Sequence, residues 1–309
     1  MQKTVFINGG AGRMICALPA LERFIQENPD GYIITEAGLD FVWGNKLLQD
    51  RTIEINTKGL FENIIRKSKI IAPEPYRDYD YYNQNLSISQ TFDKLINGSV
   101  REGFDYRPNI VLNKEEELNG VSAIKHARAE HKKEKTIVIQ PFGRSSTNDD
   151  NLGVVVDYST RSLEMKTYMA IARALKEKYN IISMSEFAIP GDDITVNPKQ
   201  LTLRKWASII DHADYFIGCD SVGQHLAYSM KKPGSVILGS TFAVNVSYPN
   251  YFNIIEKQGV EKRYSPIRIS EFGCYEADRF NDMLLEFNDK ETEEVIQNIM
   301  THIKKTIGE

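Results

Sequence analysis

One short segment of the sequence brings together residue types that bind a diphosphate. Residues 213–227 read Ala-Asp-Tyr-Phe-Ile-Gly-Cys-Asp-Ser-Val-Gly-Gln-His-Leu-Ala, so an apolar strand at Tyr215–Gly218 runs directly into two helix-capping residues and a helix. The first N–H groups of a helix lack partners and carry partial positive charge, which favours an anion, although an ordinary capped helix shows the same pattern. The candidate diphosphate-binding residues are Asp220, Ser221, Val222, Gly223, Gln224 and His225, with Gly223 expected to let the ligand approach the backbone.

A glycine-rich loop follows the first predicted strand, Thr4–Ile7. It reads Asn8-Gly9-Gly10-Ala11-Gly12-Arg13, which is neither the G-x-G-x-x-G of a dinucleotide site nor a Walker loop, so a dehydrogenase is disfavoured. Gly10 and Gly12 are candidate acceptor contacts, and Arg13 would hold an anion through two parallel bonds. A tight strand-to-helix turn explains the loop equally well.

Acidic and aromatic residues follow the next strands of the first half. Glu36 comes after the strand Tyr32–Thr35, Asp40 lies one helical turn later, and Glu74 follows the strand Lys69–Ala72. Transfer to a hydroxyl needs a group that takes its proton, but any one of these acids would also serve as a solvated loop charge. Four tyrosines after Glu74 would stack on a sugar or a base, or cover a hydrophobic hinge. They are Tyr76, Tyr79, Tyr81 and Tyr82.

Composition limits the partners of the chain. The net charge of −4 gives no global reason to bind nucleic acid, although the basic segment 125–135 would track a phosphate backbone or form a solvated helix face. The three cysteines are far apart and no histidine pair has metal spacing, so we predict reduced thiols and no metal site. Without a signal segment or an apolar stretch of roughly 18–20 residues, we expect a cytoplasmic protein that does not enter membranes. We favour a monomer.

The elements around these residues alternate between strands and helices, which is typical of parallel sheets. After a predicted strand at Asn109–Leu112, a long polar helix from Lys114 to about residue 133 leads to a second series that opens with Thr136–Gln140. The following stretch, Pro141–Ser162, is expected to be a long polar loop. We predict two domains, residues 1–134 and 135–309. The last helix, Thr292–Lys305, is capped by Asp289 and is a candidate to pack back on the first domain.

Several blocks of the sequence resemble one known family. Gly12–Leu21 is similar to a Gly-Asp-…-Leu-Pro-Ala-Leu opening, and Gln140–Gly143 followed by Arg161–Leu163 is similar to a proline-glycine turn and a basic helix start. Residues 213–227, with Pro233 and then Gly-Ser-Thr at 239–241, resemble an Asp-Ser/Thr-Gly-x-x-His-Leu-x-Ala-Ala block and a strand ending in Gly-Pro-Thr. These are features of the family-9 glycosyltransferases, the group that includes bacterial heptosyltransferases.

The resemblance implies an α/β fold of the GT-B type, with two Rossmann-like doubly wound domains facing a central cleft. The N-terminal domain would hold the acceptor, and the C-terminal domain would hold a nucleotide sugar. Transfer would invert the anomeric centre without a metal ion or other cofactor. Beside residues 220–225, the implied donor-binding residues are Gly143, Arg144, Ser145, Arg161, Ser185 and Glu186.

One departure from the family concerns catalysis. Arg13 stands where the family has its catalytic aspartate, and an arginine stays protonated and cannot act as a base. Glu36 and Asp40 are then the candidate bases, with Arg13 beside them. A catalytically silent nucleotide-sugar-binding protein is the alternative.

A second departure concerns the acceptor. The tyrosine block and the long loop Arg144–Thr160 resemble family-9 relatives carried by large tailed phages. They point to hydroxymethylated cytosine in DNA, which an enzyme reaches only after extruding the base. A lipopolysaccharide or other glycan is the alternative acceptor.

Overall fold

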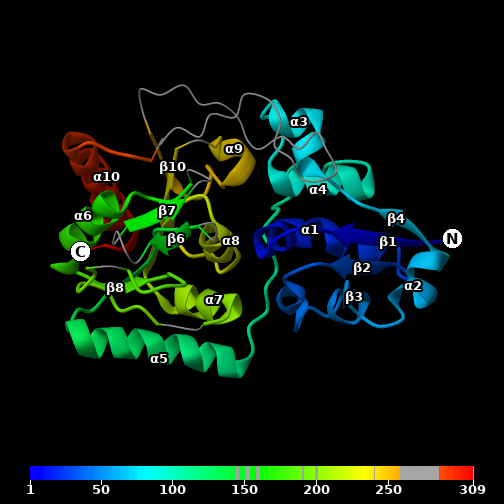
Figure 1. The fold of residues 1–309 in the computed structure, drawn as a ribbon, viewed down its shortest axis with the longest axis horizontal. Coiled ribbons are helices and arrows are strands. Elements are labelled where there is room, and N and C mark those ends of the chain that lie inside the picture. The colour runs from blue at the N-terminus through cyan, green and yellow to red at the C-terminus, as the bar shows by residue number, and fades with distance from the viewer. Residues whose placement is uncertain are drawn as a thin grey trace. The chain divides into compact units, whose positions relative to one another are not determined.

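The computed structural model describes residues 1–143, 146–149, 154–157, 161–189, 191–198, 201–239, 241–257 and 285–308. Within them the chain divides into two α/β units (Figure 1). The first unit comprises Met1–Asn113, and the second begins at Lys114 rather than at the predicted residue 135. Among the described residues, no helix has the length and apolar character that a membrane span requires.

The first unit contains a four-stranded parallel sheet in the order β3-β2-β1-β4. At its centre, Val5 of β1 pairs with Ile33 of β2 and Ile71 of β4. The predicted strand at Asn109–Leu112 is wrong, because this segment is irregular and pairs with no strand. The strands are β1 (Gln2–Ile7), β2 (Tyr32–Thr35), β3 (Thr52–Glu54) and β4 (Ser68–Ile71). The helices are α1 (Ala11–Glu27), α2 (Leu60–Asn63), α3 (Tyr79–Tyr82) and α4 (Ile88–Asn97), with short 3₁₀ turns η1 (Leu39–Val42), η2 (Gln49–Arg51), η3 (Ile65–Lys67) and η4 (Pro75–Arg77).

The second unit is built on a five-stranded parallel sheet in the order β11-β10-β9-β5-β8. Its inner strands are buried along their whole length, which explains their mainly apolar sequences. The strands are β5 (Thr136–Gln140), β8 (Asn180–Ser183), β9 (Tyr215–Gly218), β10 (Gly234–Leu238) and β11 (Asn253–Glu256). The helices are α5 (Lys114–His131), α6 (Met165–Lys176), α7 (Leu203–His212), α8 (Val222–Ser229), α9 (Ala243–Val246) and α10 (Asp289–Ile307). Part of the predicted loop 141–162 forms an antiparallel hairpin, β6 (Ser146–Asp149) with β7 (Val154–Asp157).

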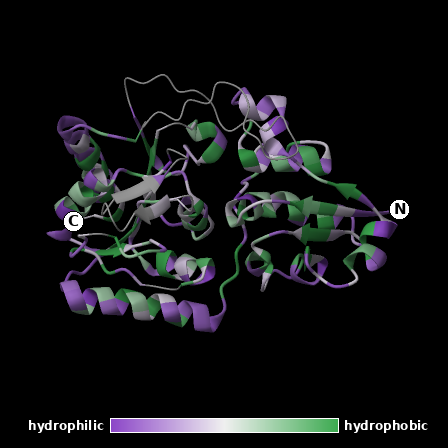
Figure 2. Cartoon of the chain, viewed as in Figure 1, coloured by the Kyte–Doolittle hydropathy of each residue, from purple (hydrophilic) through white to green (hydrophobic). Residues whose placement is uncertain are grey.

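Helix α5 belongs to the second unit because it packs closely on α7. Gly120 lacks a side chain where α7 approaches, and a Cβ there would lie 2.3 Å from the Ser208 hydroxyl. Beside this contact, the buried Arg204 guanidinium donates to both oxygens of Glu116, at 2.6 and 2.7 Å. Both ends of α5 are hydrophilic (Figure 2).

The last helix also packs within the second unit. Its buried residues Val295, Ile299 and Ile303 belong to the same hydrophobic core as the β5 and β9 side chains. The sequence made this helix a candidate to pack on the first domain. Its predicted cap is wrong by one residue, because Asn288, and not Asp289, accepts from the Glu291 N–H while the Glu291 side chain accepts from the Asn288 N–H.

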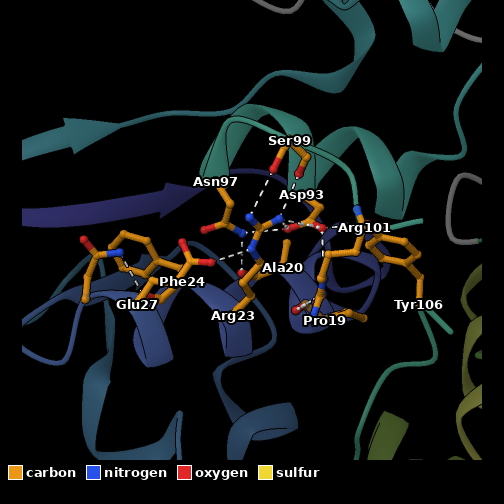
Figure 3. A network of polar contacts seen from close by, with 11 residues as sticks. Pro19, Ala20, Arg23, Phe24, Glu27, Asp93, Asn97, Ser99, Arg101 and Tyr106 are labelled. Carbon is orange, nitrogen blue, oxygen red and sulfur yellow. Dashed lines mark hydrogen bonds and ion pairs between the residues drawn. The ribbon is translucent and has the colours of Figure 1, made fainter. Parts of the chain in front are cut away.

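A buried carboxylate joins α1 to α4 in the first unit (Figure 3). Asp93 of α4 is fully buried and accepts hydrogen bonds from the Tyr106 hydroxyl at 2.6 Å and from Asn97 Nδ2 at 2.7 Å. Two arginines complete its surroundings, with Arg23 Nη1 at 3.3 Å and Arg101 Nε at 3.2 Å. Because one anion holds two cations and two neutral donors, its removal leaves several buried groups without their acceptor.

We therefore expect Asp93→Asn to lower the free energy of unfolding by about 3 kcal/mol, measured by urea denaturation. Glu27→Gln is the matched control, because Glu27 also pairs with Arg23, at 2.7 Å, but is half exposed. Its loss should cost less than about 1 kcal/mol. Equal losses in the two variants would contradict the central role given to Asp93.

Candidate functional site

The strand order of the second sheet singles out one edge for ligand binding. In chain order the strands run 2-1-3-4-5, an arrangement whose switch point lies between the first and third strands, here β5 and β9. Open α/β sheets bind ligands outside the carboxyl ends of the strands at such a point. The segments that leave the sheet there are Pro141–Gly143 and residues 219–221, which contain several of the predicted donor-binding residues.

A glutamine that the sequence analysis did not select connects these two segments. Gln140 ends β5 and is only 5% exposed. Its Oε1 accepts a hydrogen bond from the Gly223 N–H at 2.8 Å, and its Nε2 donates to Ser221 Oγ at 3.1 Å. The first turn of α8 is therefore bonded to a side chain from the neighbouring strand.

This connection replaces the cap that we predicted for α8. Ser221 stands at the N-cap position, but its side chain makes no capping hydrogen bond. The Asp220 carboxylate instead accepts from the Thr241 hydroxyl at 3.0 Å and from Gln224 Nε2 at 3.4 Å. The predicted helix start at residues 221–222 is therefore confirmed, but neither Asp220 nor Ser221 caps it, and Gln140 accepts from a first-turn N–H instead.

Gly223 has a packing role that the sequence did not reveal. A Cβ at this position would lie 2.3 Å from Gln140 Oε1 and 2.9 Å from the Phe216 ring. Such distances are too short for any real contact, so the close approach of α8 to β5 and β9 requires glycine. Glycine is thus needed here by the neighbouring side chains, whatever the ligand.

The other side of the site is a small hydrogen-bonded cluster around Ser162. Its hydroxyl accepts from the Gly143 N–H at 2.8 Å and lies 2.7 Å from the Ser146 hydroxyl. The Ser162 N–H and hydroxyl both donate to Asp157 Oδ2. A Cβ at Gly143 would lie 3.7 Å from both Ser162 Oγ and Ser221 Oγ, which places this cluster next to the start of α8. Arg144 and Ser145 lie outside the described residues.

His225 is a neutral hydrogen-bonding group at neutral pH. Burial, and secondarily the positive charge of Arg161, lower the pKa of His225 to about 4. Its Nδ1 lies 2.9 Å from the Tyr248 hydroxyl, and Tyr248 is stacked on Tyr228 with ring centres 3.7 Å apart. Burial, and then the negative charge of Asp220, raise the pKa of the Cys219 thiol, while Arg161 acts in the opposite direction, so charges of both signs lie near this turn.

Two further atoms bear on ligand binding. The Gln224 side chain is fully buried, and its Oε1 has no hydrogen-bond partner within the described part of the chain. Because a buried acceptor rarely stays without a donor, a ligand hydroxyl or an ordered water would suit this position. Ser185 and Glu186, predicted to read the base or ribose, follow β8, which pairs with β5 on the side opposite β9. The Ser185 hydroxyl donates to the Phe187 carbonyl at 2.9 Å.

In the first unit the equivalent switch point, between β1 and β4, is occupied by an ion pair. Arg13 Nη1 lies 2.9 Å from Glu74 Oε1, while Nε donates to the Asn8 carbonyl at 3.0 Å and Nη2 to the Asn8 side chain at 2.7 Å. The guanidinium carbon also lies 5.1 Å from the centre of the Tyr76 ring. This arrangement favours a structural role for Arg13, joining the loops after β1 and β4, over the expected binding of an anion.

The other predicted acids and glycines of the first unit lie in different local structures. Glu36 is exposed, and its Oε2 accepts from the Gly9 N–H at 2.6 Å. Asp40 lies in the first turn of η1. Gly10 is the N-cap residue of α1, and Gly12 lies within the helix, because α1 begins at Ala11, inside the predicted loop Asn8–Arg13.

The tyrosine block forms two short helical turns, η4 and α3. Tyr81 is completely buried, with its ring centre 5.5 Å from that of Tyr76, so it belongs to the core and not to a stacking surface. Tyr79 is 65% exposed and meets Tyr82 edge-on at 5.8 Å. The Asp78 side chain caps α3, and Lys94 binds Asp78 at 2.7 Å.

The basic segment 125–135 is partly engaged inside the second unit. Lys133 Nζ donates to the Glu177 carbonyl at 2.6 Å, Lys135 Nζ donates to the Ile307 carbonyl, and Arg128 lies 3.6 Å from Asp214. In the described ranges, no three His, Cys, Asp or Glu side chains are grouped so that they would hold a metal ion.

The fold is similar to that of known glycosyltransferases. Neither a protein-family model nor a curated protein matches the sequence. A glycosyl transferase family 9 structure from Veillonella parvula is 11% identical with a TM-score of 0.65, covering 98% of this chain and 97% of that one. The ADP-heptose lps heptosyltransferase II of E. coli is 10% identical with a TM-score of 0.60, over 98% and 99% of the two chains. An iron-containing dodecameric glycosyltransferase, TibC from enterotoxigenic E. coli, is 12% identical with a TM-score of 0.56, over 98% and 78%.

At such identities the likeness establishes the fold. The chain has the α/β architecture of GT-B glycosyltransferases, with two Rossmann-like units built on parallel sheets.

The packing at the start of α8 gives a direct prediction about stability. Gly223→Ala should lower the free energy of unfolding by about 1–3 kcal/mol, because the new methyl overlaps Gln140 and Phe216. Gly143→Ala is the matched control, since its Cβ would make only ordinary contacts of 3.7–3.8 Å and should change stability by less than about 0.5 kcal/mol. Denaturant unfolding of both variants measures the difference, and a Gly223→Ala variant as stable as the control would exclude the packing role.

Proposed function

We propose that the chain is an inverting glycosyltransferase that moves a sugar from a nucleotide sugar to a hydroxyl without a metal ion. The observation that carries the proposal is the first turn of α8 at the switch point of the second sheet. The Gly223 N–H donates to Gln140, and the remaining N–H groups of the first turn, with the nearby charge of Arg161, favour the diphosphate of a donor. His225, bonded to the Tyr248 hydroxyl, stays neutral near neutral pH and adds no positive charge to this turn.

The structural neighbours suggest where to look for the donor. One is named as an ADP-heptose transferase, and another E. coli heptosyltransferase structure contains ADP. A nucleoside diphosphate is therefore the first probe for this chain, with ADP ahead of UDP, GDP, CDP and dTDP.

Binding of such a probe should stabilise the protein. At a concentration near 100 times its dissociation constant, the nucleotide that binds should stabilise the folded state by about 2.7 kcal/mol, seen as a rise in melting temperature. Addition of EDTA should leave this rise unchanged. If none of the five nucleoside diphosphates, nor their common sugar conjugates, raises the melting temperature, the donor-site proposal fails.

The reaction needs a base for the acceptor. The acceptor oxygen forms a bond to the anomeric carbon, the bond from that carbon to the diphosphate breaks, and the hydroxyl proton passes to a carboxylate. We propose Glu36 for this role, because the Gly9 N–H anchors one of its oxygens and its side chain is exposed. Glu74 is less suited, since Arg13 holds it in an ion pair.

The acceptor is proposed as a hydroxyl compound, with two classes to test. For a hydroxymethylated cytosine in DNA, Tyr79 is exposed and able to stack, whereas Tyr81 lies in the core and Lys135 is bonded to the end of α10. A glycan hydroxyl requires none of these contacts. Transfer assays with both acceptors separate the two classes.

Glu36→Gln should reduce the rate of sugar transfer by about 10²–10⁴-fold, because the hydroxyl proton loses its acceptor. The rate is measured as nucleoside diphosphate formed from the nucleotide sugar. The affinity of the variant for the nucleoside diphosphate, measured by calorimetry, should be unchanged. Glu54→Gln is the matched control, since Glu54 is an exposed glutamate at the end of the neighbouring strand β3. Full activity of Glu36→Gln would remove Glu36 as the base. A wild-type protein that binds a nucleotide sugar and never turns it over would instead be a silent binding protein.

A further inference from the structure

We propose that Gln140 is a positioning residue that fixes the Ser221 hydroxyl as a hydrogen-bond donor for a phosphate oxygen of the nucleotide. The proposal rests on the proposed function, because it assumes that the diphosphate binds at the first turn of α8. It adds the last residue of β5 to that site and gives the site a defined hydrogen-bond polarity.

The direction of the hydrogen bonds follows from chemistry. The Gly223 N–H can only donate, so the Gln140 atom 2.8 Å from it must be the carbonyl oxygen. The other end of the carboxamide is then the NH₂ group, which also can only donate. Because this group lies 3.1 Å from Ser221 Oγ, the serine oxygen must accept. One backbone N–H thus sets the orientation of the whole chain of bonds.

The consequence concerns the single proton of Ser221. Its oxygen already accepts from Gln140, so its own O–H is turned toward a different acceptor. The N-terminus of α8 carries partial positive charge and Arg161 acts on the same turn, while the nearby Asp220 carboxylate already accepts from Thr241 and Gln224 and the Asp157 carboxylate from Ser162. We therefore take an anionic oxygen of the ligand as the acceptor of the Ser221 proton. A phosphate oxygen meets this requirement, whereas a cation or a pure donor does not.

The carboxamide has little freedom to turn over. It is bonded at both ends, is 5% exposed, and lies where a Cβ on Gly223 would come within 2.3 Å of its oxygen. The unpartnered Gln224 Oε1 at the same turn is a separate indication that the turn receives a ligand or an ordered water. Gln224 accepts where Ser221 donates, so the turn offers one hydrogen bond of each kind.

Gln140→Glu provides a sharp test, because it keeps the shape and changes only the polarity. A carboxylate accepts from both the Gly223 N–H and the Ser221 O–H, so the serine proton turns inward and a negative charge faces the diphosphate. We expect this variant to bind ADP, or whichever of UDP, GDP, CDP and dTDP the wild type binds, roughly 10- to 100-fold more weakly at pH 8. Binding should partly recover toward pH 5 as the new carboxyl is protonated.

Two further variants separate positioning from mere structure. Gln140→Leu removes both bonds but leaves the serine proton free to rotate, so it should bind the nucleotide more tightly than Gln140→Glu, although it is the less stable protein. In a Ser221→Ala background the proton is already absent, and the additional effect of Gln140→Glu should shrink. Calorimetric titrations of the full chain measure both comparisons.

The affinities of these variants distinguish a failure of this inference from a failure of the proposed function. Gln140→Glu with wild-type affinity at pH 8, or with the same loss in the Ser221→Ala background, overturns the role of Gln140 and leaves the proposed function intact. A wild-type protein that binds none of the five nucleoside diphosphates overturns the proposed function together with this inference.

Discussion

The hydrogen bond from the Gly223 N–H to Gln140 is the contact on which the candidate site depends. It joins β5 of the second sheet to the first turn of α8, across the point where the strand order reverses. Glycine is required at 223 because the carboxamide occupies the space of a side chain. The same bond orients Ser221, and through it the polarity that the turn presents to a ligand.

The two units fill their switch points differently. In the first, the charge of Arg13 is matched by Glu74, and both groups serve to join the loops after β1 and β4. In the second, the Gln140 carboxamide accepts from the Gly223 N–H and the Asp220 carboxylate accepts from Gln224, so both side chains position the first turn of α8.

Local sequence signals predicted the elements well and the contacts between them poorly. The strand and helix at 215–229 follow from an apolar run and a turn, and they are present. Gln140 and Gly223 lie 83 residues apart, and no local pattern connects them. Asn288 and Asp289 are equally good caps by type, and the local spacing of Glu291, three residues after Asn288, decides between them through a capping box. Tyr81 differs from Tyr79 only in the face of a short helix that the core covers.

The central claim is that a nucleoside diphosphate binds at the start of α8. A crystal structure of the full chain grown with the nucleoside diphosphate that most stabilises it tests this most directly. We predict that a phosphate oxygen lies within hydrogen-bond distance of Ser221 Oγ, while Gln140 keeps its bond to the Gly223 N–H. A nucleotide bound elsewhere, with the first turn of α8 unoccupied, would contradict the account.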